Sequence, residues 1–350
     1  MPEIDSVALL DWYRANRRAL PWREEITPYR VWISEIMLQQ TRVEAVKDYY
    51  RRFLDALPTV YDLAAVPDEL LMKLWQGLGY YSRAHNLKRA AIEIVSRFGG
   101  ELPCQSDELL TLPGIGRYTA AAIASIAFGE RIAAVDGNVL RVYARFTGDE
   151  SDILEDATKR KFEAAITADM PYSRKNCGDF TQAMIELGAT VCSPKGEPRC
   201  DACPLREACV ARREGRTAEL PVKRKKAERR IEERTVLLLR DGDRFGLVKR
   251  PDEGLLASLY EPINLLGRIS IEDVCAWLNE KGIRFDAVSD IGDAIHIFTH
   301  IEWHMHGYLV DISEIPSGTE IMMATVHEVE CEYAVPSAYR YFLKKMKEYT

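Results

Sequence analysis

Four cysteines within 18 residues constrain this chain more than any other feature of its sequence. They follow the pattern Cys192-x7-Cys200-x2-Cys203-x5-Cys209. Four thiols at this density are rarely scattered structural residues, and thiolates are ligands for zinc or for an iron–sulfur cluster. The spacing alone does not choose between these metals.

The N-terminal sequence predicts a cytoplasmic protein whose cysteines are not paired in disulfides. It has no basic leader before an apolar stretch, and no apolar run approaches the ~20 residues of a membrane span. Disulfide frameworks are rare in the cytoplasm. The remaining cysteines lie apart from the cluster and are expected to be plain buried residues: Cys104, Cys177, Cys275 and Cys331.

Helical periodicity dominates residues 6–215. Apolar residues recur there at spacings of three and four, with Pro and Gly between the periodic segments. The segments are 6–14, 31–54, 69–76, 84–98, 118–128, 138–146, 158–170 and 179–189. This part of the chain is expected to be all-α.

The pattern changes after a charged segment that includes Lys223-Arg224-Lys225-Lys226. A tether is favoured here over a strap that contacts phosphates, because charge runs are usually solvated. Beyond it, two apolar runs flank Asp241-Gly242-Asp243 and predict a β-hairpin. The other expected elements are helices at 271–281 and 336–349 and strands at 294–301 and 303–312.

These patterns predict a multidomain chain with three parts. Residues 1–220 form an all-α domain, residues 221–234 a charged linker, and residues 235–350 a small α/β domain.

The net charge of −7 alone disfavours a polyanionic partner. However, residues 1–230 carry 35 Lys and Arg against 33 Asp and Glu, whereas residues 231–350 carry 12 against 21. The balance of the first part therefore permits nucleic-acid binding.

A glycine-containing turn, Leu112-Pro113-Gly114-Ile115-Gly116, joins two predicted helices. Its backbone N–H groups and the helix that follows could bind a DNA phosphate without reading sequence. The alternative is an ordinary turn between helices. Gly114, Gly116 and Thr119 are the candidate contacts.

Two carboxylates are candidates for chemistry. Glu35 lies inside the apolar run Val31-Trp32-Ile33-Ser34-Glu35-Ile36-Met37-Leu38, where burial would raise its pKa and keep it protonated as a general acid. The alternative is a glutamate that reaches solvent at the edge of an amphipathic helix. Asp136 precedes an apolar-periodic helix, so it can cap that helix and also present a fixed carboxylate.

Together these segments resemble the adenine-specific branch of the endonuclease III-like helix–hairpin–helix DNA glycosylases. The resemblance covers nearly the whole chain, and the joint order of its motifs is highly specific. It rests on Leu20-Pro21-Trp22-Arg23, Ser34-Glu35-Ile36-Met37-Leu38-Gln39-Gln40-Thr41, Gly77-Leu78-Gly79-Tyr80-Tyr81-Ser82-Arg83, the glycine turn, Val135-Asp136-Gly137-Asn138 and the cysteines.

The resemblance implies an enzyme that removes adenine mispaired with 8-oxoguanine in double-stranded DNA. Glu35 would be the acid and Asp136 the catalytic aspartate, supported by Tyr118 and Asn138. The positions around the adenine pocket would be Trp22, Arg23 and Leu38, and those that wedge into the duplex would be Gln40 and Tyr80.

The cysteine segment matches the family's [4Fe–4S] loop, with one departure. Its first gap is seven residues, where the family pattern has six, and the extra residue in 193–199 can bulge outward. The implied ligands are Cys192, Cys200, Cys203 and Cys209.

The C-terminal part resembles the family's Nudix-like recognition domain. It lacks the Glu-rich motif of working Nudix hydrolases, so nucleotide hydrolysis is not expected. Phe298-Thr299-His300 falls where the family has Phe-Ser-His facing 8-oxoguanine. Without the resemblance, His300 would instead be grouped with His296, His304 and His306 as strand histidines that could form a metal patch.

Position 118 separates two activities. Bifunctional endonuclease III relatives carry a lysine there, whose amine attacks C1′ and permits strand cleavage, whereas this chain carries Tyr118. A monofunctional glycosylase is therefore expected, acting as a monomer with no membrane association. The alternatives are a bifunctional glycosylase and lyase, and a noncatalytic iron–sulfur protein that binds DNA.

Overall fold

The computed structural model describes residues 2–224, 229–251, 254–298 and 300–350. The chain divides into two compact units, one of residues 1–66 and 86–225 and the other of residues 67–85 and 226–350. Part of the predicted linker, residues 225–228, lies outside the described residues. None of the helices in the described part combines the length and apolar composition that a membrane crossing needs.

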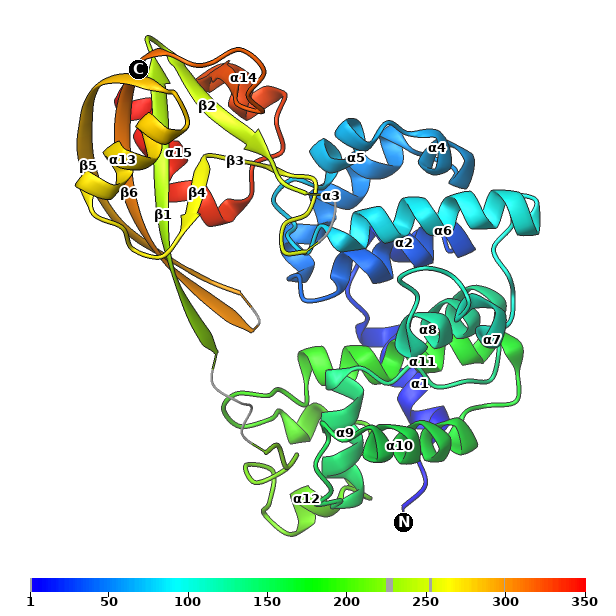
Figure 1. Ribbon diagram of the computed structural model, residues 1–350. Coiled ribbons are helices and arrows are strands. Elements are labelled where there is room, and N and C mark those ends of the chain that lie inside the picture. The colour runs from blue at the N-terminus through cyan, green and yellow to red at the C-terminus, as the bar shows by residue number, and fades with distance from the viewer. Residues whose placement is uncertain (1, 225–228, 252–253, 299) are drawn as a thin grey trace. The chain divides into compact units, whose positions relative to one another are not determined.

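The first unit is helical, as predicted (Figure 1). Its elements are α1 (Ser6–Asn16), η1 (Pro21–Arg23), α2 (Pro28–Leu38), α3 (Val43–Ala56), α4 (Val60–Ala65), most of α6 (Ser82–Phe98), α7 (Ser106–Leu109), α8 (Arg117–Phe128), α9 (Gly137–Thr147), α10 (Asp156–Asp169), α11 (Arg174–Thr190), η2 (Cys200–Ala202) and α12 (Val210–Arg213). α5 (Asp68–Trp75) groups with the second unit.

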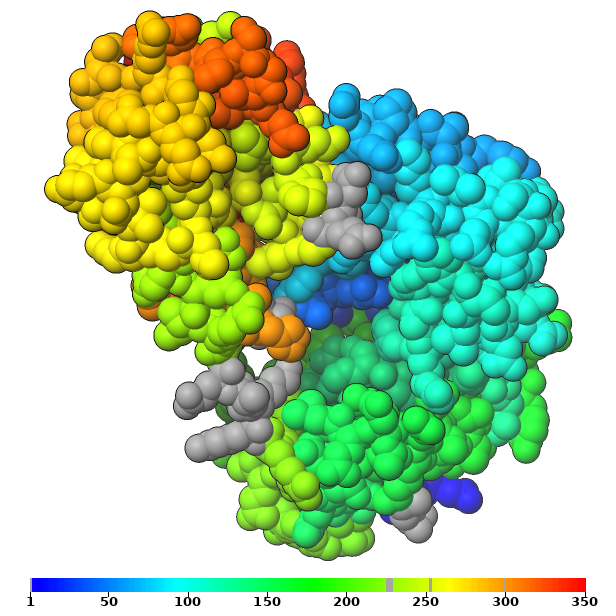
Figure 2. All heavy atoms as spheres, in the orientation of Figure 1, coloured from blue at the N-terminus to red at the C-terminus, as the bar shows by residue number. Residues whose placement is uncertain are grey.

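The N-terminal helix packs with the last helices of the first unit. Apolar side chains of α1, α9, α10 and α11 form one buried cluster, which includes Tyr13, Tyr143, Phe162 and Phe180. The helices α9, α10 and α12 gather at one end of this unit, coloured green in Figures 1 and 2. α2 and α8 pack against each other, and α11 contacts both α8 and α9. α11 therefore connects the packed pair α2 and α8 with the cluster formed by α1, α9 and α10.

The periodic segment 31–54 is not one helix, as the sequence pattern suggested, but two. α2 ends at Leu38 and α3 begins at Val43. Between them Gln40 has a φ of 55°, a left-handed conformation that interrupts helical hydrogen bonding. This corner ends the helix, and three of its residues, Gln39, Gln40 and Thr41, line the cavity described below.

The second unit contains a seven-stranded mixed sheet. Its elements are β1 (Arg230–Asp241), β2 (Arg244–Lys249), β3 (Tyr260–Glu261), β4 (Ile263–Leu266), α13 (Ile271–Glu280), β5 (Arg284–Ile297), β6 (Ile301–Glu314), β7 (Met322–Thr325), α14 (Val326–Cys331), η3 (Ser337–Tyr339) and α15 (Arg340–Glu348). β1 and β2 form the predicted hairpin, and β1 pairs in parallel with β6. One apolar cluster packs α13 on one face, and a second packs α14 and α15 on the other.

The expected burial of the isolated cysteines is correct only in part. Cys177 is buried and Cys275 partly buried, but Cys104 and Cys331 are exposed. Cys104 lies in the loop before α7, and Cys331 is the last residue of the short helix α14. Neither position faces a core, which explains the wrong prediction.

Candidate functional site

Glu35 lies in a buried helix and faces a cavity of about 450 Å³. α2 begins with Thr27 as its cap, whose side chain accepts a hydrogen bond from Arg30 N, and its residues from Val31 to Met37 are all buried. Glu35 itself is 8% exposed. The prediction of a carboxyl group surrounded by apolar residues is therefore confirmed.

Burial raises the pKa of Glu35 to about 7. The Tyr118 hydroxyl donates a hydrogen bond of 2.8 Å to Glu35 Oε2, which opposes the rise. The negative charge of Asp136 adds to the rise, and the positive charge of Arg23 opposes it. A carboxylic acid with this pKa can hold a proton near neutrality and transfer it.

Asp136 lines the same cavity and caps α9, as predicted. Its Oδ1 accepts hydrogen bonds from Asn138 N and Val139 N, both at 2.8 Å, and its Oδ2 accepts one from Asn138 Nδ2 at 2.8 Å. Burial raises the pKa of Asp136, and these hydrogen bonds counteract it. The carboxylate is thus fixed in direction as well as in position.

Asn138 holds Asp136 and is itself held by α9 and α11. Arg141 Nη2 donates to Asn138 Oδ1 at 3.0 Å and to the Gly188 carbonyl at 2.7 Å. A Cβ on Gly188 would lie 2.6 Å from Asn138 Cβ, so only glycine lets α11 come this close. The resemblance also assigned Tyr118 to the aspartate, but its hydroxyl donates to Glu35 instead.

The other predicted pocket residues also line this cavity. They are Trp22, Arg23 and Leu38, and Gln40, which was predicted to wedge into the duplex, lines it as well. Trp22 is buried and packs edge-on against Tyr50 at 5.6 Å between ring centroids. Sequence reasoning did not identify Arg18 and Gln182, two further polar residues of the cavity wall.

Two residues predicted to wedge into DNA have left-handed backbones. Gln40 has a φ of 55° and Tyr80 a φ of 48°. Such conformations cost a non-glycine residue ~1 kcal/mol or more and persist where the surrounding structure imposes them, often at functional sites. Gln40 is exposed, and Tyr80 is 46% exposed despite its large ring.

The turn between α7 and α8 matches the predicted phosphate site in part. Gly114 has a φ of 74°, and a Cβ there would lie 2.6 Å from Asn86 Cβ. Gly116 is exposed and begins α8 without a side-chain cap, so its surroundings are open to a ligand. Thr119 does not fit its predicted role. It is 2% exposed, and its hydroxyl accepts a hydrogen bond from Gln39 Nε2 at 3.2 Å.

The four clustered cysteines line one small cavity between α9 and the loop that leads to α12. Arg145, Arg206 and Arg212 lie around the same cavity, and Arg145 Nη1 donates to Cys192 Sγ at 3.3 Å. Residues 194–197 of the long first gap are exposed, so the extra residue does not keep Cys192 and Cys200 from the cavity. No three His, Cys, Asp or Glu residues in the described part are arranged to hold a metal ion.

The donor set of this cavity fits a metal cluster. Four cysteines from one segment line it and all of them are free of disulfides, which is the donor chemistry of an iron–sulfur cluster, although the described residues form no site for a single metal ion. The surrounding arginines can neutralise the charge of thiolate ligands.

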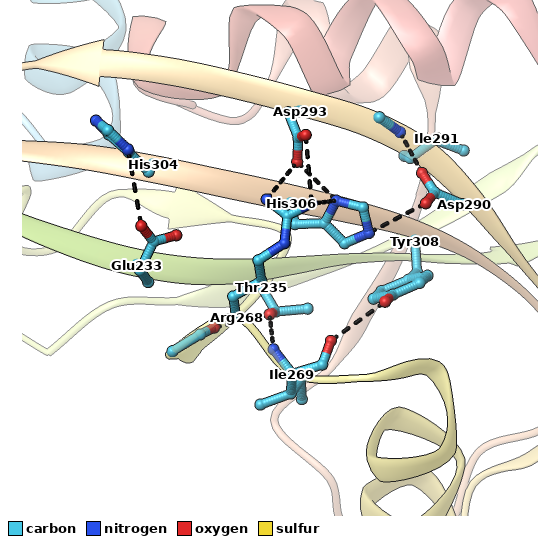
Figure 3. Close-up of polar contacts among 12 residues, drawn as sticks. Glu233, Thr235, Arg268, Ile269, Asp290, Ile291, Asp293, His304, His306 and Tyr308 are labelled. Atoms are coloured by element: carbon cyan, nitrogen blue, oxygen red, sulfur yellow. Dashed lines mark hydrogen bonds and ion pairs between the residues drawn. The ribbon is translucent and has the colours of Figure 1, made fainter.

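The histidines of β6 are paired with carboxylates (Figure 3). His306 Nδ1 lies 2.7 Å from Asp293 Oδ1 and its Nε2 lies 3.2 Å from Asp290 Oδ2. His304 Nδ1 lies 3.7 Å from Glu233 Oε1, as the figure shows, and its Nε2 lies 2.9 Å from Glu302 Oε1. His300 is separate from this row, exposed in the loop between β5 and β6. Phe298 is partly buried and packs on Trp303 at 4.9 Å, and Thr299 lies outside the described residues.

The fold and the two carboxylates define a base-excision DNA glycosylase. Residues 33–167 match the HhH-GPD superfamily base excision DNA repair protein family, and residues 235–345 match the NUDIX domain family. The structure of a thermostable thymine-DNA glycosylase is 28% identical, with a TM-score of 0.53 over 60% of this chain and 95% of that one. An endonuclease III in a non-covalent DNA complex is 26% identical, with a TM-score of 0.50 over the same shares.

Curated relatives narrow the class further. Adenine DNA glycosylase of Arabidopsis thaliana is 36% identical over 90% of this chain and 58% of its own length, and that of Mus musculus is 34% identical over 89% and 71%. That of Buchnera aphidicola from Schizaphis graminum is 32% identical over 89% and 88%. The chain belongs to the adenine DNA glycosylase family, which confirms the resemblance and the predicted fold class.

Proposed function

We propose that this chain removes adenine mispaired with 8-oxoguanine or guanine from double-stranded DNA and leaves an abasic site. One observation carries the proposal. A carboxylic acid with a pKa of about 7, Glu35, and a hydrogen-bonded carboxylate, Asp136, line the same cavity. The names of the relatives support adenine as the base.

The chemistry requires both groups. The adenine anion leaves C1′ poorly, so Glu35 protonates the base as the N-glycosidic bond breaks. The sugar then develops positive charge, which the Asp136 carboxylate stabilises or bonds transiently before water attacks. The base reaches the cavity only after it has been flipped out of the helix, and flipping costs least at a mismatch.

The test of this function is base excision from a duplex with adenine opposite 8-oxoguanine. We expect alkali to cleave the adenine strand after incubation, with little cleavage before alkali is added. Because Tyr118 lacks a nucleophilic amine, borohydride should trap little or no covalent complex. Strand cleavage without alkali, together with efficient trapping, would show a bifunctional enzyme. DNA binding without excision would favour the noncatalytic alternative.

We further propose that His300 faces 8-oxoguanine. Its side chain is exposed on the loop between β5 and β6, and its carbonyl accepts a hydrogen bond from Arg230 N. His300→Ala should therefore leave the fold intact but reduce the preference for 8-oxoguanine over guanine ~10-fold, about the discrimination of one good base contact. The measurement compares excision rates on the two duplexes. His304→Ala, whose ring pairs with Glu302, is the control that should keep the preference. An unchanged ratio in His300→Ala would reject the assignment.

We infer that Cys192, Cys200, Cys203 and Cys209 hold a [4Fe–4S] cluster. When bound, the cluster would supply structural cross-linking of the loop from Cys192 to Cys209, while Arg145 supports that loop through the Ser193 carbonyl at 2.9 Å. Purified protein should be brown, with a broad absorbance near ~400 nm and about four irons per chain. Cys203→Ser should lose most of this absorbance, and Cys104→Ser should keep it. A colourless protein that contains zinc would reject the cluster.

The proposal also retains three expectations about where and how the protein acts. They are a monomeric state, a cytoplasmic location, and double-stranded DNA as the partner. The phosphate site at Gly114 and Gly116 supports the last of these.

A further inference from the structure

A third carboxylate, that of Glu186, is buried beside the cavity that Glu35 and Asp136 line. It lies near the end of α11 and is 0% exposed. Burial opposes its ionisation, but hydrogen bonds from Arg18 and the charge of Arg23 outweigh burial and lower the pKa of Glu186. Unlike Glu35, it is therefore a permanent negative charge at neutral pH.

Both oxygens of Glu186 are used. Oε1 accepts hydrogen bonds from Arg18 N at 3.1 Å and Arg18 Nε at 2.7 Å. Oε2 accepts from Arg18 Nη2 at 2.8 Å and Arg23 Nη2 at 2.9 Å. The carboxylate thus fixes the chain on both sides of Leu20–Trp22, the segment that contributes Trp22 to the cavity wall.

Arg23 is held at every nitrogen of its guanidinium. Besides the bond to Glu186, its Nε donates to Gln182 Oε1 at 3.2 Å and its Nη1 to the Arg18 carbonyl at 3.1 Å. Its side chain is only 9% exposed. Arg23 lines the same cavity as Glu35.

We propose that Glu186 is a positioning residue that holds the Arg23 guanidinium beside Glu35 and so sets the acidity of the catalytic acid. This inference rests on the proposed function, because it concerns how well Glu35 donates a proton to the departing base. Glu186 acts through Arg23 and has no contact with the base.

The groups that face Glu35 make the sign of the effect clear. In the described part of the chain the groups that shift its pKa are Tyr118 on α8, Asp136 at the start of α9 and Arg23 on η1, while Arg18 lines the same cavity paired with Glu186. Of the groups that shift the pKa, only Arg23 is a cation, and its charge lowers the pKa of Glu35. A buried guanidinium that has lost its carboxylate partner is unfavourable, so without Glu186 the Arg23 side chain should turn toward solvent. Glu35 would then become a weaker acid.

The experiment compares single-turnover pH–rate profiles on the duplex with adenine opposite 8-oxoguanine. The variants are Glu186→Gln, Arg23→Gln and the double variant. The alkaline limb of the profile reports loss of the Glu35 proton, and in each variant it should shift to higher pH by about half a unit. The rate below that limb should fall by up to ~3-fold, because an acid weaker by about half a pKa unit transfers its proton more slowly by at most that factor. The double variant should excise adenine as fast as Arg23→Gln alone, because the two single substitutions disrupt the same interaction between Glu186 and Arg23.

The matched control is Asp179→Asn on the same helix. Asp179 pairs with Arg14 at 3.2 Å and does not line the cavity, so its variant should keep the wild-type profile. Thermal unfolding of each variant separates loss of fold from loss of positioning. If Glu186→Gln does not fold, Arg23→Gln still tests the inference, because it leaves the bonds between Glu186 and Arg18 in place.

The outcomes separate this inference from the proposed function. If the wild-type protein excises no adenine, the proposed function is wrong. In the other case the wild type excises adenine, while the alkaline limb of the variants stays in place or shifts to lower pH, or the losses add up in the double variant. Either result would refute only the role of Glu186.

Discussion

Glu35→Gln should reduce adenine excision by ~10³-fold while DNA binding persists, because the variant keeps the shape of the side chain and loses its proton. The Gln oxygen can still accept the hydrogen bond from Tyr118, which is 2.8 Å long in the wild type. The apolar surroundings of the side chain are also unchanged. The measurement is the single-turnover rate on the duplex with adenine opposite 8-oxoguanine, together with its binding affinity.

The control for this variant is Glu44→Gln, which changes an exposed glutamate on α3 that pairs with Lys47. It should excise adenine at the wild-type rate. A Glu35→Gln protein that kept more than about a tenth of wild-type activity would contradict the role of Glu35 as the acid, since general acid catalysis contributes at least ~10²-fold.

The same variant has an opposite effect on stability. The folded-state pKa of Glu35, about 7, lies above the ordinary value of 4.5, so its protonated form is the one that the fold favours. Stability from this group is fully present below pH 4.5 and is lost as the pH rises through 7, by up to ~3 kcal/mol. Glu35→Gln, which never ionises, should therefore be more stable than the wild type at pH 8 and no more stable at pH 4.5. Chemical denaturation at the two pH values measures this difference.

Local patterns were enough to single out the two candidate carboxylates, although the segment around Glu35 by itself favoured a buried acid no more than a glutamate that reaches solvent. The apolar run around Glu35 and the position of Asp136 before a periodic helix both describe interactions within a few residues, and both are present in the structure. The helices α9 and α10 and the hairpin of β1 and β2 follow from the same kind of short-range signal.

Long-range pairings could not be predicted in this way. The partner of Tyr118 is Glu35, 83 residues away, and the partners of Glu186 are more than 160 residues away. A signal for Glu186 was nevertheless present, because it lies in the apolar run Ala183-Met184-Ile185-Glu186-Leu187, much as Glu35 lies in its own. The same long-range packing buried Thr119, whose neighbours in sequence suggested a position at the DNA.

Asp136→Asn should also reduce excision by ~10³-fold, although it should hardly affect the fold. Asn and Asp are about equally good caps, so the Asn oxygen can still accept the bonds from Asn138 N and Val139 N. The variant lacks the negative charge that stabilises the sugar cation, and its amide would face the amide of Asn138, where the wild type has an acceptor.

A matched control separates the two roles of Asp136. Asp5 caps α1 in the same way, accepting from Val7 N and Ala8 N at 3.1 and 3.0 Å, but it lies outside the cavity. Asp5→Asn should therefore keep full activity, and both variants should unfold within a few degrees of the wild type. If Asp136→Asn excised adenine at more than about a tenth of the wild-type rate, its carboxylate would be only a helix cap, because a charge that stabilises the transition state in a buried site contributes at least ~10²-fold. The loss of activity without loss of stability is what distinguishes a catalytic carboxylate from a structural one at this position.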